Sequence, residues 1–287
     1  MRTRRTRHPA RRFFLRLFLL LVLLLGFCYW SNHSLQTTRF TLTFPDLPQG
    51  FDGCRITVLA DTHGARFGDH NERLLRAVAD TDPAYIFFPG DLEDSYRGPE
   101  PGYAEELAAG LAAIAPTYYV TGNHEWAIGD VPELKERLRD CGVHVLSNQF
   151  LPLEQNGDVL LLAGIDDPNG RADQKTPEAL AAEVDALDGD PFWILLAHRN
   201  NYFASQYSLL GADLVICGHG HGGIIRLPFT DGLFGHGDLL PSYTAGVYER
   251  NGSTLFATRG LGNSGGTRRL FNRPEVAVLT LHRADAP

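Results

Sequence analysis

Residues 55–63 read RITVLADTH, an apolar run that stops on an aspartate and a histidine. A nearly continuous apolar run of this length is typical of a strand that is buried on both faces of a sheet. Other apolar runs of the chain also end on polar residues that bind metals well. These are AYIFF (84–88) before Asp91, TYYV (117–120) before Asn123 and His124, FWILLA (192–197) before His198, and DLVIC (213–217) before His219 and His221. Ligand sites in α/β sheets form just beyond the carboxyl ends of the strands, so we expect these side chains to meet at one edge.

The rest of the pattern also predicts an α/β fold, because apolar runs alternate with amphipathic helical stretches. Further strands are expected at 143–146, 159–164, 254–258 and 275–281, and helices at 69–80, 103–115, 132–140, 173–187 and 202–210. No internal repeat or composition break divides residues 36–287. We therefore expect one catalytic domain there, with a long Gly-rich loop at about 226–248.

Charge is distributed unevenly along the 287 residues. Residues 1–45 hold eight of the 26 basic residues and none of the 34 acidic ones. The acidic body repels a phosphate backbone, so nucleic acid is not expected as a partner. The four cysteines form no CxxC pair and show no regular spacing, which argues against a disulfide framework and against a structural zinc site.

Residues 1–16 form a basic segment, and residues 17–35 are predicted to be a transmembrane anchor. The apolar run 17–30 spans roughly 21 Å as a helix, and counting from Phe13 gives roughly 27 Å, against about 30 Å for a bilayer core. A cleaved signal peptide has an apolar run of similar length, but residues 28–38 offer no small-x-small cleavage pair. Seven arginines precede the run, so we expect a single-pass protein of the cell membrane with a cytoplasmic N-terminus and an extracytoplasmic body.

Within the basic segment, RRFFLR (11–16) resembles the twin-arginine export signal, Arg-Arg-x-Phe-Leu-Lys. Arg16 replaces the lysine, and Ala10 stands where serine or threonine is usual. The resemblance implies export of an already folded protein, which suits a metal site that is loaded in the cytoplasm. The same arginines also satisfy the positive-inside rule by themselves, and both interpretations stay open.

The residue types at the strand ends fit a pair of divalent ions. Two ions roughly 3.5–4 Å apart need a carboxylate that bridges them, together with oxygen ligands and neutral imidazoles. Asp91 is the natural bridge, because a carboxylate has two oxygens to share. Asn123 contributes a neutral amide oxygen. The pattern therefore predicts a dinuclear metal site without thiolate ligands.

The full motif series is DTH (61–63), GDLED (90–94), GNHE (122–125), AH (197–198) and GHGH (218–221). It resembles that of the calcineurin-like metallophosphoesterases over about residues 51–282. The phrases GHGHGGIIRLP (218–228), RGLG (259–262) and NRPEVAVLTL (272–281) resemble the membrane-anchored or twin-arginine-exported bacterial branch, which usually has threonine between the histidines and glutamine at 224. The resemblance implies a four-layer αββα sandwich of two mixed sheets behind an N-terminal transmembrane helix.

The resemblance also implies roles for particular residues. Asp61, His63, Asp91 and His221 would hold one metal, and Asp91, Asn123, His198 and His219 the other. The ions would be manganese, zinc or iron. A hydroxide that bridges them would attack phosphorus in line, and His124 would contact the phosphate and protonate the leaving oxygen.

The predicted activity is hydrolysis of phosphate mono- or diesters at the outer face of the cytoplasmic membrane, on a substrate near the membrane surface. One alternative is a pyrophosphatase acting on a nucleotide-diphosphate-linked lipid precursor, although such a substrate would lie on the cytoplasmic side. A second is a non-catalytic metal-binding protein of the same fold, which would not need the general acid His124.

Several weaker signals have both a functional and a structural interpretation. Arg199 and Arg269 are candidate substrate contacts, with Arg268 and Arg273 as further possibilities, although surface solvation also explains them. Asp166 and Glu93 could support the metal ligands, and His236 could be a solvated loop residue. GLGNSGG (260–266) matches a dinucleotide loop and a nucleophile elbow, but no helix follows it, so we interpret it as a Gly-rich loop near the site.

Overall fold

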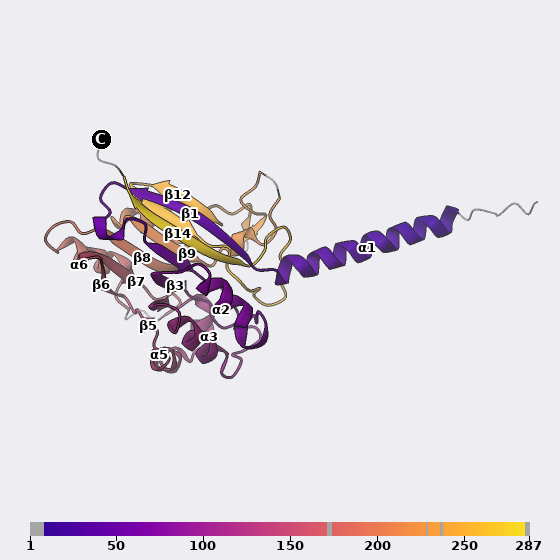
Figure 1. The fold of residues 1–287 in the computed structure, drawn as a ribbon, viewed down its shortest axis with the longest axis horizontal. Coiled ribbons are helices and arrows are strands. Elements are labelled where there is room, and N and C mark those ends of the chain that lie inside the picture. The colour runs from indigo at the N-terminus through magenta and orange to yellow at the C-terminus, as the bar shows by residue number, and fades with distance from the viewer. Residues whose placement is uncertain (1–8, 171–173, 228, 236–237, 285–287) are drawn as a thin grey trace, which may run out of the picture.

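The computed structural model describes residues 9–170, 174–227, 229–235 and 238–284. His236 and the first eight residues of the basic segment lie outside these residues. Helix α1 (Pro9–His33) projects from a layered body, and the described C-terminal end lies at the opposite end of that body (Figure 1). Among the described residues, one stretch, Ala10–His33, is long and apolar enough to cross a membrane. Its most apolar part is not buried in the body, whereas Ser31 and Asn32 near its end are.

The first sheet contains the strands that precede Asp61, Asp91 and Asn123. Its order is β1-β14-β2-β3-β4-β5, formed by β1 (Gln36–Phe44), β14 (Glu275–Arg283), β2 (Arg55–Val58), β3 (Tyr85–Pro89), β4 (Thr117–Val120) and β5 (His144–Val145). Strands β2 to β5 are parallel, and β14 runs antiparallel to β2. The parallel strands therefore deliver their carboxyl ends to one edge.

The second sheet contains the strands that lead to His198 and His219. Its order is β12-β13-β9-β8-β7-β6, formed by β12 (Gly246–Arg250), β13 (Ser253–Ala257), β9 (Leu214–Gly218), β8 (Trp193–Arg199), β7 (Asp158–Gly164) and β6 (Gln149–Gln155). Strands β7, β8, β9 and β13 are parallel, whereas the edge strands β6 and β12 pair antiparallel. Both sheets are mixed, as expected.

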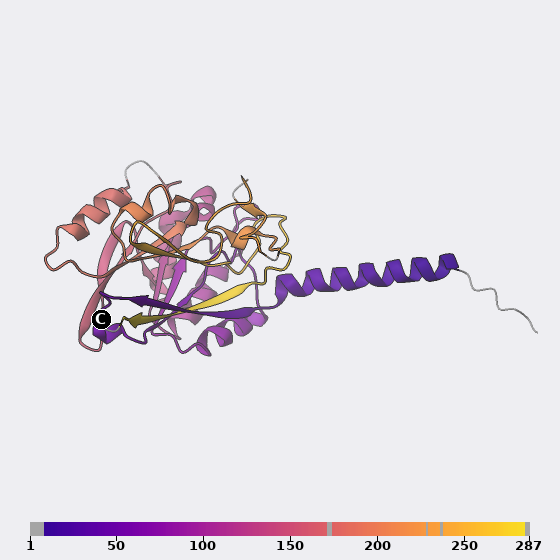
Figure 2. The same cartoon turned by 90° about the horizontal axis from the view of Figure 1, so that it is seen from above.

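Three apolar layers hold the sheets and helices together. The central layer lies between the sheets, where Phe87 and Val120 of one pack with Leu196 and Ile216 of the other. A second layer joins the first sheet to α2 (Glu72–Ala79), α3 (Tyr103–Ala112) and α5 (Val131–Asp140). A third joins the second sheet to α6 (Pro177–Asp185). The four-layer αββα sandwich is confirmed, and Figure 2 shows it from above.

The structure corrects one predicted element and adds others. The helix expected at 202–210 is wrong, because the chain forms two short 3-10 turns, Asn200–Tyr202 and Tyr207–Leu209, with a non-helical backbone at Gln206 between them. Phe203 and Tyr207 are buried all the same, so the apolar stripe reflects packing and not an α-helix. Strands β1, β6 and β12, the short hairpin of β10 (Phe234–Gly235) and β11 (Asp238–Leu239), and helix α4 (Asn123–Ile128) were not predicted.

Candidate metal centre

The polar side chains predicted from the strand ends meet where the carboxyl edges of the two sheets adjoin. Asp61 follows β2, Asp91 follows β3, and Asn123 and His124 open α4 after β4. From the second sheet, His198 lies in β8, and His219 and His221 follow β9. Backbone bonds fix the loops to one another: Asp61 N–H donates to the Gly90 carbonyl and His63 N–H to that of Asp91, each at 3.1 Å.

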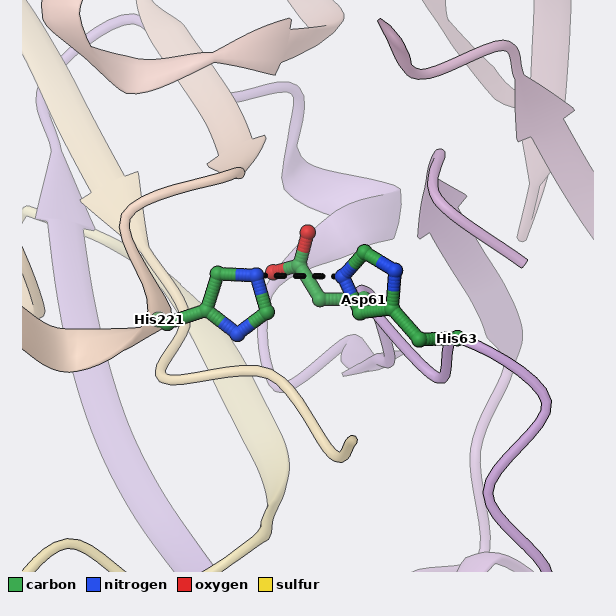
Figure 3. Close-up of side chains that lie close together, drawn as sticks. All are labelled: Asp61, His63 and His221. Carbon is green, nitrogen blue, oxygen red and sulfur yellow. Dashed lines mark hydrogen bonds between the residues drawn. The ribbon is translucent and has the colours of Figure 1, made fainter. Parts of the chain in front are cut away.

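Within the described residues, three groups of side chains could each hold a cation. They are Asp61, His63 and His221; His63, Asp91 and His124; and Asp91, His198 and His219. The ligand atoms of each group lie within 4.8 Å of one another. In the first group the two imidazoles face each other beside the Asp61 carboxylate, with 3.1 Å between their Nε2 atoms (Figure 3). Asn123 Oδ1 lies 3.1 Å from His198 Nε2, so the amide joins the third group.

The centre concentrates buried charge. Burial is the main cause that raises the pKa of Asp61 to about 7, and the neighbouring Asp91 adds to it. Burial opposes the charge on His198, but Asp91, at 3.2 Å, raises the His198 pKa to about 10. His63 has its pKa lowered to about 4, chiefly by burial. A bound cation would favour the ionised form of the buried Asp61 carboxylate. It could also be coordinated directly by His63, because burial keeps that imidazole neutral.

The backbone at these residues is strained. Asp61, His63, Asp91, His219 and His221 all have positive φ angles, between 45° and 67°. Residues other than glycine rarely adopt this region, and such strain gathers at functional sites, where the surrounding structure holds it.

A close approach of two glycines allows the loops to meet. A Cβ on Gly90 would lie 2.5 Å from the Gly122 nitrogen, and a Cβ on Gly122 would lie 2.2 Å from Asp91 Oδ1. Both glycines are therefore required for the Asp91 and Asn123 loops to touch without a steric clash.

The imidazole of His124 belongs to the second group and is held at both nitrogens. The Ser95 N–H donates to Nδ1 at 3.0 Å, which assigns the proton of the neutral ring to Nε2. Nε2 lies 3.2 Å from the Ser264 hydroxyl and 3.9 Å from Asp91 Oδ2. A proton on Nε2 therefore faces the same space as the carboxylates. No sequence pattern predicts Ser95 or Ser264, because both contacts join separate loops.

Glu125 is a further residue of the site, and no role was predicted for it. Its buried carboxylate accepts hydrogen bonds from the backbone N–H groups of Asp91, Glu93 and Gly122, at 3.1, 3.1 and 2.7 Å. Glu125 thus ties the loop that carries Asp91 to the first turn of α4. A glutamate at the third helical position is a capping signal that could have identified it.

The two arginines predicted to contact substrate already have protein partners. Arg199 donates from two nitrogens to the Asp167 carboxylate, at 2.6 and 3.0 Å. Arg269 is fully buried and donates to the carbonyls of Gly262 and Arg259, and its Nη2 lies 3.1 Å from His221 Nδ1. Arg269 therefore orients a candidate ligand, and the substrate contacts of both arginines stay predictions.

The two supporting acids suggested by the sequence lie in different places. Asp166 accepts from Thr121, Lys135 and Asn148, next to the turn that leads to Asn123. Glu93 is buried, and its N–H donates to Glu125.

The donor set fits two divalent ions. It combines two buried carboxylates, an amide oxygen and imidazoles whose ring nitrogens face one another at distances suited to a shared cation. Within the described residues, none of the three groups includes a cysteine. Cys217, which precedes His219 in the sequence, is buried within β9.

Comparison with known proteins agrees with this geometry. The family model for calcineurin-like phosphoesterases matches residues 54–223. The chain belongs to this family, whose members use a dinuclear metal centre, and it is a hydrolase that acts on phosphoester bonds.

Several related proteins align with most of this chain. A zebrafish (Danio rerio) transmembrane protein with a metallophosphoesterase domain is 31% identical over 252 residues, 83% of this chain and 55% of the relative. The Bacillus subtilis metallophosphoesterase YkuE is 26% identical over 263 residues, 88% of this chain and 87% of YkuE. The Escherichia coli phosphodiesterase YaeI is 29% identical over 234 residues, 79% of this chain and 82% of YaeI. The chain thus spans about half the length of the zebrafish relative.

A solved structure supports the fold alone. The sulfate thiohydrolase SoxB of Thermus thermophilus superposes with a TM-score of 0.53 at 13% identity, over 83% of this chain and 58% of that one.

Proposed function

We propose that this chain is a membrane-anchored phosphoesterase that hydrolyses phosphate mono- or diesters at the outer face of the cytoplasmic membrane. The observation that carries the proposal is the convergence of the candidate metal groups with His124, whose protonated Nε2 faces the same space. A protein that only binds metal has no use for a proton donor held at that position.

The geometry supports the division of ligands that the family resemblance implies. Asp61, His63 and His221 would hold one ion with Asp91, and His198, His219 and Asn123 would hold the other with Asp91 between them. Asp91 lies within reach of both sets, since its Oδ2 is 3.7 Å from His63 Nε2 and 3.2 Å from His198 Nε2. Two such ions lower the pKa of water and neutralise phosphoryl oxygens when bound.

The chain's own residues complete the chemistry. His124 holds a proton at Nε2, and Ser95 keeps the ring in the orientation that presents it to a leaving oxygen. Glu125 and Arg269 keep the backbone of Asp91 and the ring of His221 in place. The acidic body holds no excess of positive charge, so metal charge is the main attraction for a phosphate group.

Three observations support the anchored, outward-facing arrangement. Helix α1 has the length and composition of a membrane span, and relatives from zebrafish and Bos taurus are named transmembrane proteins. The excess of arginine before the apolar run favours a cytoplasmic N-terminus. Protease treatment of intact cells should therefore digest the body, and a protected body would contradict the orientation.

The activity is tested with the full-length chain in detergent. We expect about two bound Mn²⁺, Zn²⁺ or Fe²⁺ ions per chain and hydrolysis of a nitrophenyl mono- or diester. Asp91→Asn should lose both metal and activity, whereas His124→Ala should keep the metal and lose about 10²–10⁴-fold in kcat. His70→Ala, which removes an exposed histidine outside the site, is the matched control and should behave as wild type. Full metal content without hydrolysis of any phosphoester would refute the proposal.

A further inference from the structure

Large apolar side chains are exposed at the end of the body from which α1 emerges. They come from the segment 224–243, which includes the β10–β11 hairpin, and from the segment 259–273. We call this set the apolar rim, and its members are Leu227, Phe229, Phe234, Leu239, Leu240 and Phe271. Phe229 is fully exposed, and Leu239 and Leu240 keep 69% and 61% of their surface. Soluble proteins rarely expose apolar side chains in such a group unless the surface binds something.

The rim is continuous with the anchor. The Phe271 ring lies 5.2 Å from that of Phe27 in α1. In Figures 1 and 2 the orange strands of the hairpin lie beside the body end of α1, and α6 lies at the far end. If α1 crosses a bilayer, the end of the body that carries the rim faces the lipid.

The rim is also tied to the metal centre. The Leu233 N–H donates to the carbonyl of Gly223, two residues after His221, at 3.1 Å. The Arg226 N–H donates to the carbonyl of Leu270, next to Arg269, at 3.0 Å. Whatever covers the rim therefore lies close to the loops that carry a candidate ligand and the arginine that orients it.

The chemistry of the rim favours lipid tails over a charged partner. The segments 224–243 and 259–273 hold five arginines and two aspartates. Arg259 pairs with Glu275, and Arg269 and Arg273 donate to backbone carbonyls. The remaining bases, Arg226 and Arg268, are matched by Asp231 and Asp238. At the end of α1, Tyr29 and Trp30 are exposed, and aromatic side chains of this kind gather at the membrane interface. Arg273 stacks over the Trp30 ring at 4.8 Å, which fixes the anchor's end against the body.

We propose that the apolar rim inserts into the outer leaflet of the bilayer that holds α1, so that the metal centre takes a phosphoester carried by a lipid in that leaflet. This inference rests on the anchored orientation proposed above, and it adds a second membrane contact and a substrate class. Insertion of the rim places the loop of His221 at headgroup depth, so a lipid-borne phosphate reaches the centre without leaving the membrane.

Insertion is tested by depth-dependent quenching in nanodiscs that hold one full-length chain each. In a Cys28→Ala, Cys141→Ser background, Phe229→Cys is labelled with bimane, and nitroxides are placed on the upper acyl chains of phosphatidylcholine. Leu187→Cys, just after α6 at the far end of the body, is the matched control. We expect strong quenching at 229 and little at 187, in purely zwitterionic lipid. Equal quenching at both sites, or a label at 229 that is open to aqueous iodide, would overturn the proposal, since a second copy cannot cover the rim in a single-chain disc.

The substrate class is tested with Leu239→Asn/Leu240→Asn, which changes exposed rim residues outside the metal centre. Hydrolysis of a fluorescent phosphodiester lipid in vesicles should fall about tenfold, because two inserted leucines lose their burial in lipid. Hydrolysis of a soluble nitrophenyl diester and the metal content should stay at the wild-type level. An equal fall on both substrates would overturn the proposal. If the wild type hydrolyses no phosphoester at all, the proposed function fails, while the quenching result still decides insertion.

Discussion

The Asn32 side chain, in the last turn of α1, pairs with the backbone of Arg269 in both directions. Asn32 Nδ2 donates to the Arg269 carbonyl and the Arg269 N–H donates to Asn32 Oδ1, each at 2.8 Å. Asn263 donates to the same Asn32 oxygen at 3.1 Å. The segment held in this way reaches the site twice, because Ser264 touches His124 and the Arg269 guanidinium touches His221. The end of α1 is thus part of the scaffold of the candidate metal centre.

Asn32→Ala should therefore impair catalysis. The change leaves the buried Arg269 N–H and carbonyl without their side-chain partner, which costs about 1–3 kcal/mol for each group. We expect kcat to fall about tenfold, because displaced positioning residues slow the chemical step. Ser31→Ala is the control, since Ser31 is buried but its hydroxyl bonds to nothing in the described part of the chain. Equal kcat values for the two variants would contradict this role of α1.

Glu125→Gln should weaken metal binding. The carboxylate accepts three backbone N–H groups, and an amide nitrogen in place of one oxygen would point a donor at a donor. Groups that hold metal ligands in place change affinity by about 10–100-fold when they are altered. Titration with Mn²⁺ measures the effect, and Glu133→Gln, at an exposed position of α5, is the control. Unchanged affinity in Glu125→Gln would show that the turn holds without the carboxylate.

Loading the metal-free protein should release protons. Without a cation, the pKa of His198 is raised to about 10 and that of Asp61 to about 7, so at pH 7 the imidazole is protonated and the carboxyl is partly protonated. Both must lose their protons to act as ligands, so binding at pH 7 releases the proton of His198 and part of the proton of Asp61. Calorimetry of Mn²⁺ binding in buffers of different ionisation enthalpy measures this number. Heats that are independent of the buffer would contradict the titration of the two groups.

Lys135→Met should destabilise the fold more than the loss of a surface ion pair. Lys135 Nζ donates to Asp166 at 2.7 Å and to Ser147 at 2.8 Å, and both members of the ion pair are nearly buried. Removing one partner of a buried pair costs about 3–5 kcal/mol. The control is Lys175→Met, whose bond to Glu183 is solvent-exposed and contributes about 0–1 kcal/mol. Denaturant unfolding of the metal-loaded chain compares them, and equal costs would refute the distinction.

The metal-binding residues at the strand ends were predictable because each follows an apolar run that is typical of a buried strand. An apolar run followed by Asp61 or Asp91 is visible within ten residues, and the strands are parallel, so their ends had to converge. The positions of His198 and His219 followed from the same pattern in the second sheet. The helix at 202–210 was wrong because a stripe of buried side chains does not distinguish an α-helix from consecutive 3-10 turns.

The supporting contacts were not predictable, because they join residues that are far apart in the chain. Asn32 and Arg269 are 237 positions apart, and no periodic pattern links them. Arg269 was predicted to contact substrate because of its positive charge. In the structure its guanidinium is hydrogen-bonded to backbone carbonyls and lies against His221. Glu125 stood inside a quoted motif, but its role depends on the backbone of the neighbouring loop.

The pairing of β1 with β14 has a consequence for biosynthesis. Strand β1, which directly follows α1, aligns in parallel with β14, from Gln36 beside Glu275 to Phe44 beside Arg283. The ribosome must therefore synthesise the chain as far as Arg283 before β1 can pair along its full length. Pairings so distant in sequence form slowly and leave sheet edges open in the meantime. We expect the newly made chain to depend on chaperones between synthesis and closure of this sheet.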